Sequence, residues 1–474
     1  MYTVFEIQQQ RQFRTAGYDL GIFDQAIRGY AHFHAPVSLM KGVHNNFGTH
    51  FSILGDHFSP ILAALGPVYL LFPHAMTLLV AQGVLFAASV PFVWLFTRRA
   101  LGTTSAYVIA VAYALSWGLQ AAMGADFHEV AFAVPLLAIA IERLDAGKLR
   151  VAIGAALLLL LVKEDYGLVV AMFALVVGFR TKQWPLAAAL AVAGVAATVL
   201  ADKVFIPAAG GKSNYYWAYY QALGPDPVSA LWHVVRHPLA TWHLAVSPHE
   251  KVTLLRWLFA PLGFASLASP FVLLALPLLA ERLLSQNPNH WTLTHQYSAP
   301  FVPILTLAAV DGVGRLRRLT EGLRRGHTSA RHRGIAPRVH AVGPVVYSLG
   351  VLAVAVWACG RMPFNELTKA SMWRTSAYTK VQQAAVDVVP SGVSVEASNW
   401  LAPHLVDRAD VMLLDATPHN APWVVFDEGN IEFPMTPAAQ SARVEWLSSH
   451  GYSAVFSQSG IVVYHRTSAP PTTS

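Results

Sequence analysis

Ionisable side chains gather in five short motifs, each at the edge of an apolar stretch of the chain. The first motif, Tyr18–Gln25, carries two carboxylates, Asp19 and Asp24. The other four are Gly55–Pro60 with Asp56 and His57, Asp126–Glu129 with His128, Lys163–Tyr166 with Glu164 and Asp165, and His295–Tyr297. A carboxylate in a partly apolar pocket can act as a general base or hold a divalent cation, whereas lysine and histidine can bind phosphate. Brought together, these residue types would form a site for a charged substrate.

Each motif also has a plain structural interpretation. Asp19 or Asp24 can cap the helix that follows, and Asp56 with Ser59 can satisfy the free N–H groups at a helix start. The charges of Lys163–Asp165 can pair with one another. We name Asp19 and Asp24 as catalytic candidates and Asp19, Asp56 and His57 as candidate ligands of a divalent cation such as Mg²⁺ or Mn²⁺. The candidates for binding substrate or phosphate are His57, Asp126, His128, Glu129, Lys163, Glu164, Asp165, His295 and Tyr297.

The composition places these motifs in a membrane protein. Hydrophobic residues make up 54% of the 474 residues and charged residues 12%, against roughly 25% charged in soluble domains. The net charge of +7 is concentrated in Arg315–Arg338, which contains eight arginines and one acid, Glu321. A cytoplasmic loop facing anionic lipid, over residues 315–340, explains this basic run without a nucleic-acid partner. The single cysteine, Cys359, excludes an intramolecular disulfide.

Hydropathy predicts about ten membrane spans within residues 75–358. Residues 1–74 are expected to form an outer loop that carries the first motif and a short surface helix, Pro60–Phe72. Residues 207–251 are expected to form a further outer segment. The spans are Ala75–Phe96, Ser105–Met123, Val130–Ile141, two within Val151–Phe179, Pro185–Ile206, Val252–Leu267, Pro270–Leu283, Phe301–Val313 and Val342–Trp357.

The apolar run Val151–Phe179 decides the topology. As one helix it would be about 43 Å long and would place Lys163, Glu164 and Asp165 near the bilayer centre. A hairpin of two short helices brings both basic flanks to the cytoplasmic side and the three charges to the other. With this hairpin, the positive-inside rule puts all five motifs on the outer face of the membrane.

The remaining segments are assigned more briefly. Alternating strand and helix patterns predict a small extracytoplasmic α/β domain over residues 361–466, and residues 467–474 are expected to be disordered. Asn214–Gln221 is rich in aromatic residues, which favours an interfacial aromatic belt, with sugar stacking as the alternative. The sequence contains no phosphate-binding loop, HExxH or Gly-x-Ser-x-Gly motif, which argues against ATP-driven transport, zinc proteolysis and α/β-hydrolase chemistry.

The order of the five motifs resembles a family of polytopic bacterial membrane proteins known only as a domain of unknown function. The resemblance extends over roughly Tyr18–Arg466 and rests on the sequences of the five motifs, the last read as His295–Pro300. That family in turn is similar to the GT-C glycosyltransferases, which take a sugar from a polyprenyl-phosphate carrier at the outer membrane face. The resemblance implies Asp19 as base or metal ligand. It implies contact with the carrier phosphate or a metal for His57, His128, Lys163 and Glu164. It also implies a span before Tyr18, where the sequence shows none.

We therefore predict an α-helical, GT-C-like polytopic protein of the cell membrane with its motifs and C-terminal domain outside. The predicted function is transfer of a sugar from a polyprenyl-phosphate donor to an envelope glycan or protein acceptor. Two alternatives remain at this point. One is a transporter or flippase of lipid-linked glycans that uses the same charges as a vestibule, and the other is a non-catalytic envelope scaffold. Membrane lipid is a partner in each of the three, and the identity of the sugar and of the acceptor is open.

Overall fold

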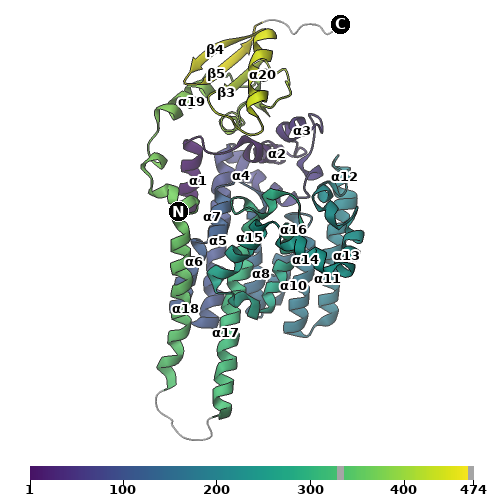
Figure 1. The fold of residues 1–474 in the computed structure, drawn as a ribbon, viewed down its shortest axis with the longest axis vertical. Helices are drawn as coiled ribbons and strands as arrows, with labels where there is room; N and C mark the ends of the chain where they lie inside the picture. The colour runs from purple at the N-terminus through teal and green to yellow at the C-terminus, as the bar shows by residue number, and fades with distance from the viewer. Residues whose placement is uncertain (328–335, 468–474) are drawn as a thin grey trace.

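The computed structural model describes residues 1–327 and 336–467 of the chain, with side chains described for 1–321 and 343–467. The expected disordered tail and the middle of the basic loop lie outside these ranges. Figure 1 shows a tall bundle of helices with a small β-sheet domain at one end. Short helices from the start of the chain lie between the two.

The first 74 residues form four short helices and several tight turns rather than an extended loop. These helices are α1 Tyr2–Arg11, α2 Ile22–Ala31, α3 Leu39–His44 and α4 Gly66–Leu71. A π-helical turn, Gly17–Gly21, precedes α2 and carries Asp19. Helix α1 contacts the bundle, where Gln82 of α5 donates a hydrogen bond to Glu6 at 3.0 Å.

The bundle is built from helices of very different lengths. They are α5 Ala75–Leu101, α6 Thr103–Ala114, α7 Trp117–Met123, α8 Ala133–Asp145, α9 Leu149–Leu158, α10 Tyr166–Thr181, α11 Trp184–Leu200, α12 Ile206–Ala208, α13 Pro227–Arg236, α14 Pro238–Val246, α15 His249–Phe259, α16 Leu276–Leu284, α17 Phe301–His327 and α18 Ala336–Cys359. The turn Ile53–Gly55 and the 3₁₀ segments Pro60–Leu65 and Tyr215–Leu223 complete the part that matters for the site.

Among the described residues, four helical stretches are long and apolar enough to cross a bilayer, where the sequence predicted about ten spans. They are Ala75–Leu101, Thr103–Met123, Trp184–Ala208 and Gln296–Glu321. Four shorter apolar helices are Pro60–Leu71, Leu149–Leu161, Tyr166–Thr181 and Gly343–Cys359. The predicted pair Val252–Leu267 and Pro270–Leu283 is broken into α15, 3₁₀ turns and α16, because Pro261 and Pro270 interrupt helical hydrogen bonding.

The apolar run Val151–Phe179 is divided as the charges predicted. Helix α9 and the following turn Leu159–Leu161 end before Lys163, and α10 begins at Tyr166. Helix α10 then packs closely on α11 through two glycines. A Cβ at Gly167 would lie 2.1 Å from the carbonyl oxygen of Gly194, and one at Gly194 would lie 2.4 Å from that of Gly167. Only glycine permits this approach of the two backbones.

The C-terminal domain is a five-stranded mixed sheet in the order β2-β1-β3-β5-β4. Its strands are β1 Ser394–Ala397, β2 Asp410–Leu413, β3 Trp423–Asp427, β4 Tyr452–Gln458 and β5 Ile461–Arg466. Strand β1 pairs in parallel with β2 and β3, with Val395 opposite Val411 and Trp423, and β5 pairs antiparallel with β3 and β4. Helices α19 Ala377–Val388 and α20 Pro437–Ser449 belong to the same domain.

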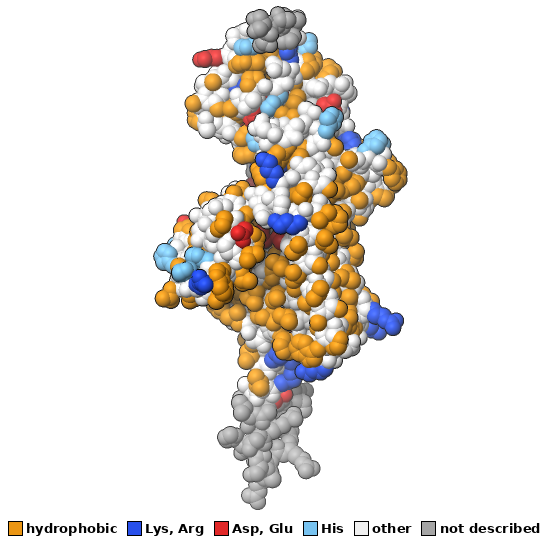
Figure 2. Space-filling model, turned by 90° about the vertical axis from the view of Figure 1, so that its right-hand side faces the viewer, with side chains coloured by type: hydrophobic (Ala, Val, Ile, Leu, Met, Phe, Trp, Pro, Cys, Tyr) orange, Lys and Arg blue, Asp and Glu red, His pale blue; other side chains and the backbone are white. Residues whose placement is uncertain are grey.

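Three bundle helices share a direction that organises the molecule. Helix α8 follows His128 and Glu129, α10 follows Lys163–Asp165, and α17 follows Gln296 and Tyr297. Asp145 and Arg180, in the last turns of α8 and α10, form an ion pair, and Arg180 also pairs with Asp311, which lies three turns into α17. The starts of these helices therefore meet at one end of the bundle and their later turns at the other. Figure 2 shows hydrophobic side chains over the middle of the molecule and Lys and Arg side chains both above this region and at the lower end of the bundle.

Candidate functional site

A cavity of about 540 Å³ lies where the starts of α8, α10 and α17 meet the turn that carries Asp19. Nine of the residues singled out from the sequence line it: Asp19, Asp56, His57, His128, Glu129, Lys163, Glu164, Asp165 and Tyr297. All five motifs thus contribute to one cavity, His295–Tyr297 through Tyr297 and its neighbour Gln296. Three helices begin at its wall, so their partial positive ends face the same space and favour an anion there.

Asp19 lies opposite His128 in this cavity. Their Oδ1 and Nε2 atoms are 3.6 Å apart, and the side chain of Asp19 is 42% exposed whereas that of His128 is 8% exposed. Burial by itself would raise the pKa of the Asp19 carboxyl, but the attraction of His128 outweighs it and holds that pKa below its usual range. Burial opposes protonation of His128 in turn, and Asp19 more than offsets it, so the pKa of His128 is raised. Asp19 is therefore an ionised carboxylate that is open to the cavity.

The turn around Asp19 is fixed from two sides. The Ala16 N–H donates to Asp126 Oδ2 at 2.7 Å, and the Gln82 side chain donates to the Asp126 carbonyl at 2.8 Å. From the C-terminal domain, Asn399 accepts hydrogen bonds from the N–H groups of Gly17 at 2.7 Å and Tyr18 at 3.0 Å. Asp126 is buried and positions this turn rather than lining the cavity, and its burial raises its pKa to about 7.

His57 and Glu164 form a tight pair on another wall. His57 Nδ1 lies 2.8 Å from Glu164 Oε1, and the Phe58 N–H donates to the second carboxylate oxygen at 3.0 Å. The ring of His57 stacks on Tyr216 with centroids 4.7 Å apart. Burial opposes charge on both members, but their mutual attraction prevails: the pKa of His57 is raised and that of Glu164 falls to about 2. Because Glu164 occupies Nδ1, the Nε2 edge of His57 remains for a ligand.

Lys163 stands between two carboxylates without a short contact to either. Its Nζ is 3.6 Å from Asp165 and 3.8 Å from Glu281 of α16. Burial lowers the pKa of Lys163, but these two carboxylates attract the ammonium group strongly enough to raise that pKa well above its usual value. Both distances exceed those of a normal hydrogen bond, so the ammonium protons can reach a third acceptor in the cavity.

Asp56 is engaged by a lysine that the sequence analysis did not select. Lys41 Nζ lies 2.8 Å from Asp56 Oδ2, and the Tyr216 hydroxyl donates to Asp56 Oδ1 at 2.5 Å. The expected helix-capping role of Asp56 is therefore not observed, and neither is the cap expected of Ser59. These contacts also bear on the metal candidates Asp19, Asp56 and His57, since each of the three is paired with a different partner. Among the described residues no group of three His, Cys, Asp or Glu side chains is arranged to hold a metal ion.

Asp24 and His295 lie outside the cavity lining. Asp24 is fully buried in α2, where it accepts from the Tyr69 hydroxyl at 2.7 Å and pairs with Arg28 at 3.0 Å. Burial is the main reason that its pKa rises to about 6. It makes no capping bond to the helix start. His295 does not line the cavity, and the centre of its ring lies 6.1 Å from that of the lining residue Tyr297.

Several residues that line the cavity were not selected as site candidates from the sequence. They are Lys41, Tyr216, Tyr219, Tyr220, Glu281, Asn287, Asn289, His290 and, from the C-terminal domain, Phe433. The three tyrosines belong to the aromatic segment that was interpreted as an interfacial belt. Glu281 interrupts an apolar run, and an ionisable residue in such a run is itself a signal of a functional site. No feature of the sequence around Lys41 or Phe433 indicated that these residues belong to the site.

Comparison with solved structures identifies the fold. The structure resembles that of ArnT from Cupriavidus metallidurans bound to undecaprenyl phosphate, with a TM-score of 0.52 at 12% identity over 98% of this chain and 96% of that one. The apo structure of the same protein gives 0.52 at 14% identity with the same coverage. The chain thus has the polytopic fold of the GT-C glycosyltransferases.

The family assignment is more specific. The chain belongs to the family described as predicted membrane protein (DUF2079), whose pattern matches residues 10–463. A comparison with curated proteins finds no match. A third structure, the Archaeoglobus fulgidus oligosaccharyltransferase tethered to an acceptor peptide with an NVT sequon, is similar at a TM-score of 0.42 and 12% identity, over 96% of this chain and 70% of that one.

Proposed function

We propose that the chain is a membrane glycosyltransferase that moves a sugar from a polyprenyl-phosphate donor to an envelope acceptor at the outer face of the membrane. The observation that carries the proposal is the single cavity in which an open, ionised carboxylate, Asp19, faces the same space as cations held by partly buried carboxylates. The similar fold of ArnT, seen with undecaprenyl phosphate, supports a lipid-linked phosphate as the ligand class.

The donor phosphate is assigned to Lys163 and His57. The ammonium group of Lys163 makes no short ion pair with Asp165 or Glu281, so its protons are available to a phosphate. The Nε2 atom of His57 is likewise available, and Glu164 stabilises the positive charge of the ring. The starts of α8 and α10 add their helix dipoles. These groups stabilise the negative charge that grows on the leaving phosphate oxygen in the transition state.

The acceptor hydroxyl is assigned to Asp19. The hydroxyl oxygen attacks the anomeric carbon, and its proton passes to the Asp19 carboxylate. The bond between the anomeric carbon and the phosphate oxygen breaks, and its electron pair stays with the phosphate. The products are a glycosylated acceptor and polyprenyl phosphate. His128 keeps Asp19 ionised before the step, which a general base requires.

The C-terminal domain has a supporting role in this scheme. Asn399 fixes the turn that carries Asp19, and Phe433 contributes to the cavity wall. Phe433 also contacts the ring of Tyr18 edge to face, with centroids 5.2 Å apart. The positive-inside rule supports an outer location for the cavity and this domain, because four arginines, Arg99, Arg180, Arg315 and Arg318, line a cavity at the other end of the bundle.

The test is transfer by the purified full chain, reconstituted in liposomes with a labelled polyprenyl-phosphate sugar and an acceptor extract. We expect Asp19→Asn to lower the release of polyprenyl phosphate roughly 10²- to 10⁴-fold, the usual contribution of a general base. The matched control is Asp387→Asn, which changes a carboxylate of α19 whose side-chain hydrogen bond, within the described part of the chain, is with Gln383. That variant should keep wild-type activity.

Two results would contradict the proposal. If Asp19→Asn keeps full activity while the wild type is active, Asp19 is not the base. If the wild type moves intact labelled donor across the bilayer and releases no polyprenyl phosphate, the cavity belongs to a transporter.

A further inference from the structure

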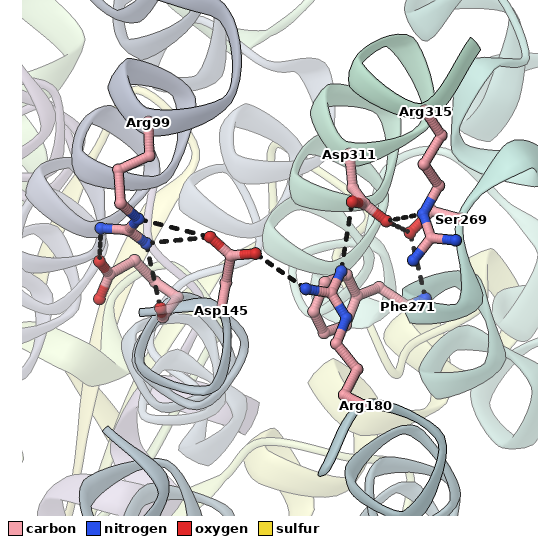
Figure 3. Close-up of polar contacts among 8 residues, drawn as sticks. Arg99, Asp145, Arg180, Ser269, Phe271, Asp311 and Arg315 are labelled. Carbon is pink, nitrogen blue, oxygen red and sulfur yellow. Dashed lines mark hydrogen bonds and ion pairs between the residues drawn. The ribbon is translucent and has the colours of Figure 1, made fainter. Parts of the chain in front are cut away.

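A second cavity, of about 740 Å³, lies at the far end of the bundle from the candidate site. Five charged residues from α5, α8, α10 and α17 alternate in sign along its wall, as Figure 3 shows. In order they are Arg99, Asp145, Arg180, Asp311 and Arg315. The alternation joins four helices that are distant in sequence.

The carboxylates of this network are fully used. Asp145 accepts from Arg99 through one oxygen, at 3.3–3.4 Å, and from Arg180 through the other, at 2.9 Å. Asp311 Oδ1 pairs with Arg180 at 3.2 Å, while its Oδ2 accepts from Ser269 at 2.6 Å and Arg315 Nε at 2.7 Å. Both oxygens of each aspartate therefore have at least one partner.

The arginines, in contrast, retain unused donors. Arg315 contacts Asp311 through Nε alone, so its two terminal nitrogens have no hydrogen bond among the described residues. The exposed side chain of Arg318, one turn further along α17, lines the same cavity and makes no described ion pair. Buried Arg180 Nε also lacks a hydrogen-bond partner within the described part of the chain. Four arginines and two aspartates line the cavity, which leaves it positively charged.

The rest of the wall is apolar. It is formed by Phe96, Ala100, Phe179, Pro270 and Leu273, and the side chain of Phe179 is 53% exposed at its edge. A free inorganic anion would make no use of such a surface. An amphiphile would place its hydrocarbon against this wall and its charge on the guanidinium groups, which bind phosphate oxygens in a bidentate manner.

We propose that this cavity binds the phosphodiester head group of an anionic glycerophospholipid, with Arg315 and Arg318 as the contacts. Arginine-lined pockets between helices at a membrane surface are suited to such head groups. The site is separate from the glycosyl-transfer cavity and does not depend on the proposed function. The single negative charge of the phosphodiester would offset part of the positive charge of the four arginines.

The experiment measures lipid retention by native mass spectrometry after the full-length protein is exchanged into mixed phosphatidylglycerol and phosphatidylcholine. We expect the wild type to retain phosphatidylglycerol preferentially. Arg318→Gln removes a cation without breaking a described ion pair, and it should lower that preference roughly 5-fold. Leu273→Trp puts a larger side chain on the apolar wall and so narrows the cavity without a change of charge, and it should also lower the preference for phosphatidylglycerol.

The matched control is Arg98→Gln. Arg98 is at the same end of α5, but it lies over the ring of Trp94, 5.2 Å away, and does not line the cavity. It should leave the preference unchanged. An equal loss in Arg98→Gln would overturn the proposal in favour of general surface charge. Displacement of the lipid by millimolar inorganic phosphate would overturn it in favour of a site for free anions.

Discussion

The pairing of His57 with Glu164 leads to a prediction about the charge of His57. Glu164→Gln keeps the size of the side chain but removes its negative charge, and with it the attraction that raises the pKa of His57. We expect the pKa of His57 to fall in this variant. His57 would then lose its proton at a lower pH than in the wild type, and the leaving phosphate would lose one of its two cations near neutrality.

The strength of the attraction between His57 and Glu164 can be judged from the pKa of Glu164. Burial raises the pKa of Glu164, yet the net pKa falls from an ordinary 4.5 to about 2, chiefly through His57 and then Lys163. A shift of about 2.5 units corresponds to about 3 kcal/mol at 1.36 kcal/mol per unit. Because the interaction is reciprocal, we expect the pKa of His57 to fall in this variant, while Lys163, which supplies part of the effect on Glu164, stays in place.

The contribution of the His57–Glu164 pair to the stability of the protein depends on pH. The attraction requires protonated His57 and ionised Glu164. Its contribution is fully present between the ordinary pKa of a glutamate and that of a histidine, about pH 4.5 to 6.5. It is lost as the pH rises through the raised pKa of His57, and as the pH falls through that of Glu164, about 2. The destabilisation caused by Glu164→Gln should therefore be largest in that window.

The assay is deuterium exchange at the imidazole C2 position, followed by mass spectrometry over a pH series, which reports the pKa of one histidine in the intact protein. The control is Asp165→Asn, which removes the same charge one residue away without touching His57. If the pKa of His57 in Glu164→Gln remains within 0.3 unit of the wild type, or if Asp165→Asn lowers it equally, the assignment of this pair is refuted.

Two further predictions concern the scaffold. Gly194→Ala should lower the free energy of unfolding by about 1–3 kcal/mol, because the added methyl meets the Gly167 carbonyl, whereas Gly154→Ala, with nothing within 4 Å, should not. Thermal unfolding in detergent compares the two, and equal effects would contradict the close packing of α10 on α11. Arg443→Met should cost about 3–5 kcal/mol, because it leaves the buried Glu396 carboxylate without its cation. Limited proteolysis of the C-terminal domain would detect this. Adding Glu396→Gln, which removes the charge but keeps an acceptor for the N–H groups of His419 and Ala421, should restore part of the loss.

Much of the fold was predictable because its signals are local. Charges in the middle of an apolar run are costly in a membrane, so Lys163–Asp165 had to lie at a turn, and the structure places them there. Strand and helix alternation likewise predicted the C-terminal sheet. The predicted pair of spans within Val252–Leu283 was wrong, because hydropathy alone does not register the prolines that break this segment into short helices.

The site was only partly predictable, for a different reason. Asp19, His57 and Lys163 could be selected because a charge beside an apolar segment is conspicuous by itself. Lys41 and Phe433 acquire their meaning only through long-range contacts, with Asp56 and with Tyr18 respectively. The tyrosines at 216, 219 and 220 were visible in the sequence, but an aromatic run near a membrane has a common interfacial interpretation that hid their place in the cavity wall.

The charge distribution inside the cavity limits where a donor phosphate can bind under the proposed function. Six carboxylates line the cavity against two lysines. Lys41 is held at 2.8 Å by Asp56, whereas Lys163 has no contact shorter than 3.6 Å. A phosphate placed beside Asp19 would meet a carboxylate that His128 keeps ionised, and like charges at short range repel strongly in a partly buried site. The phosphate therefore belongs on the side of Lys163, and the uncharged acceptor hydroxyl belongs beside Asp19. This order places the sugar between the two groups, as displacement at the anomeric carbon requires.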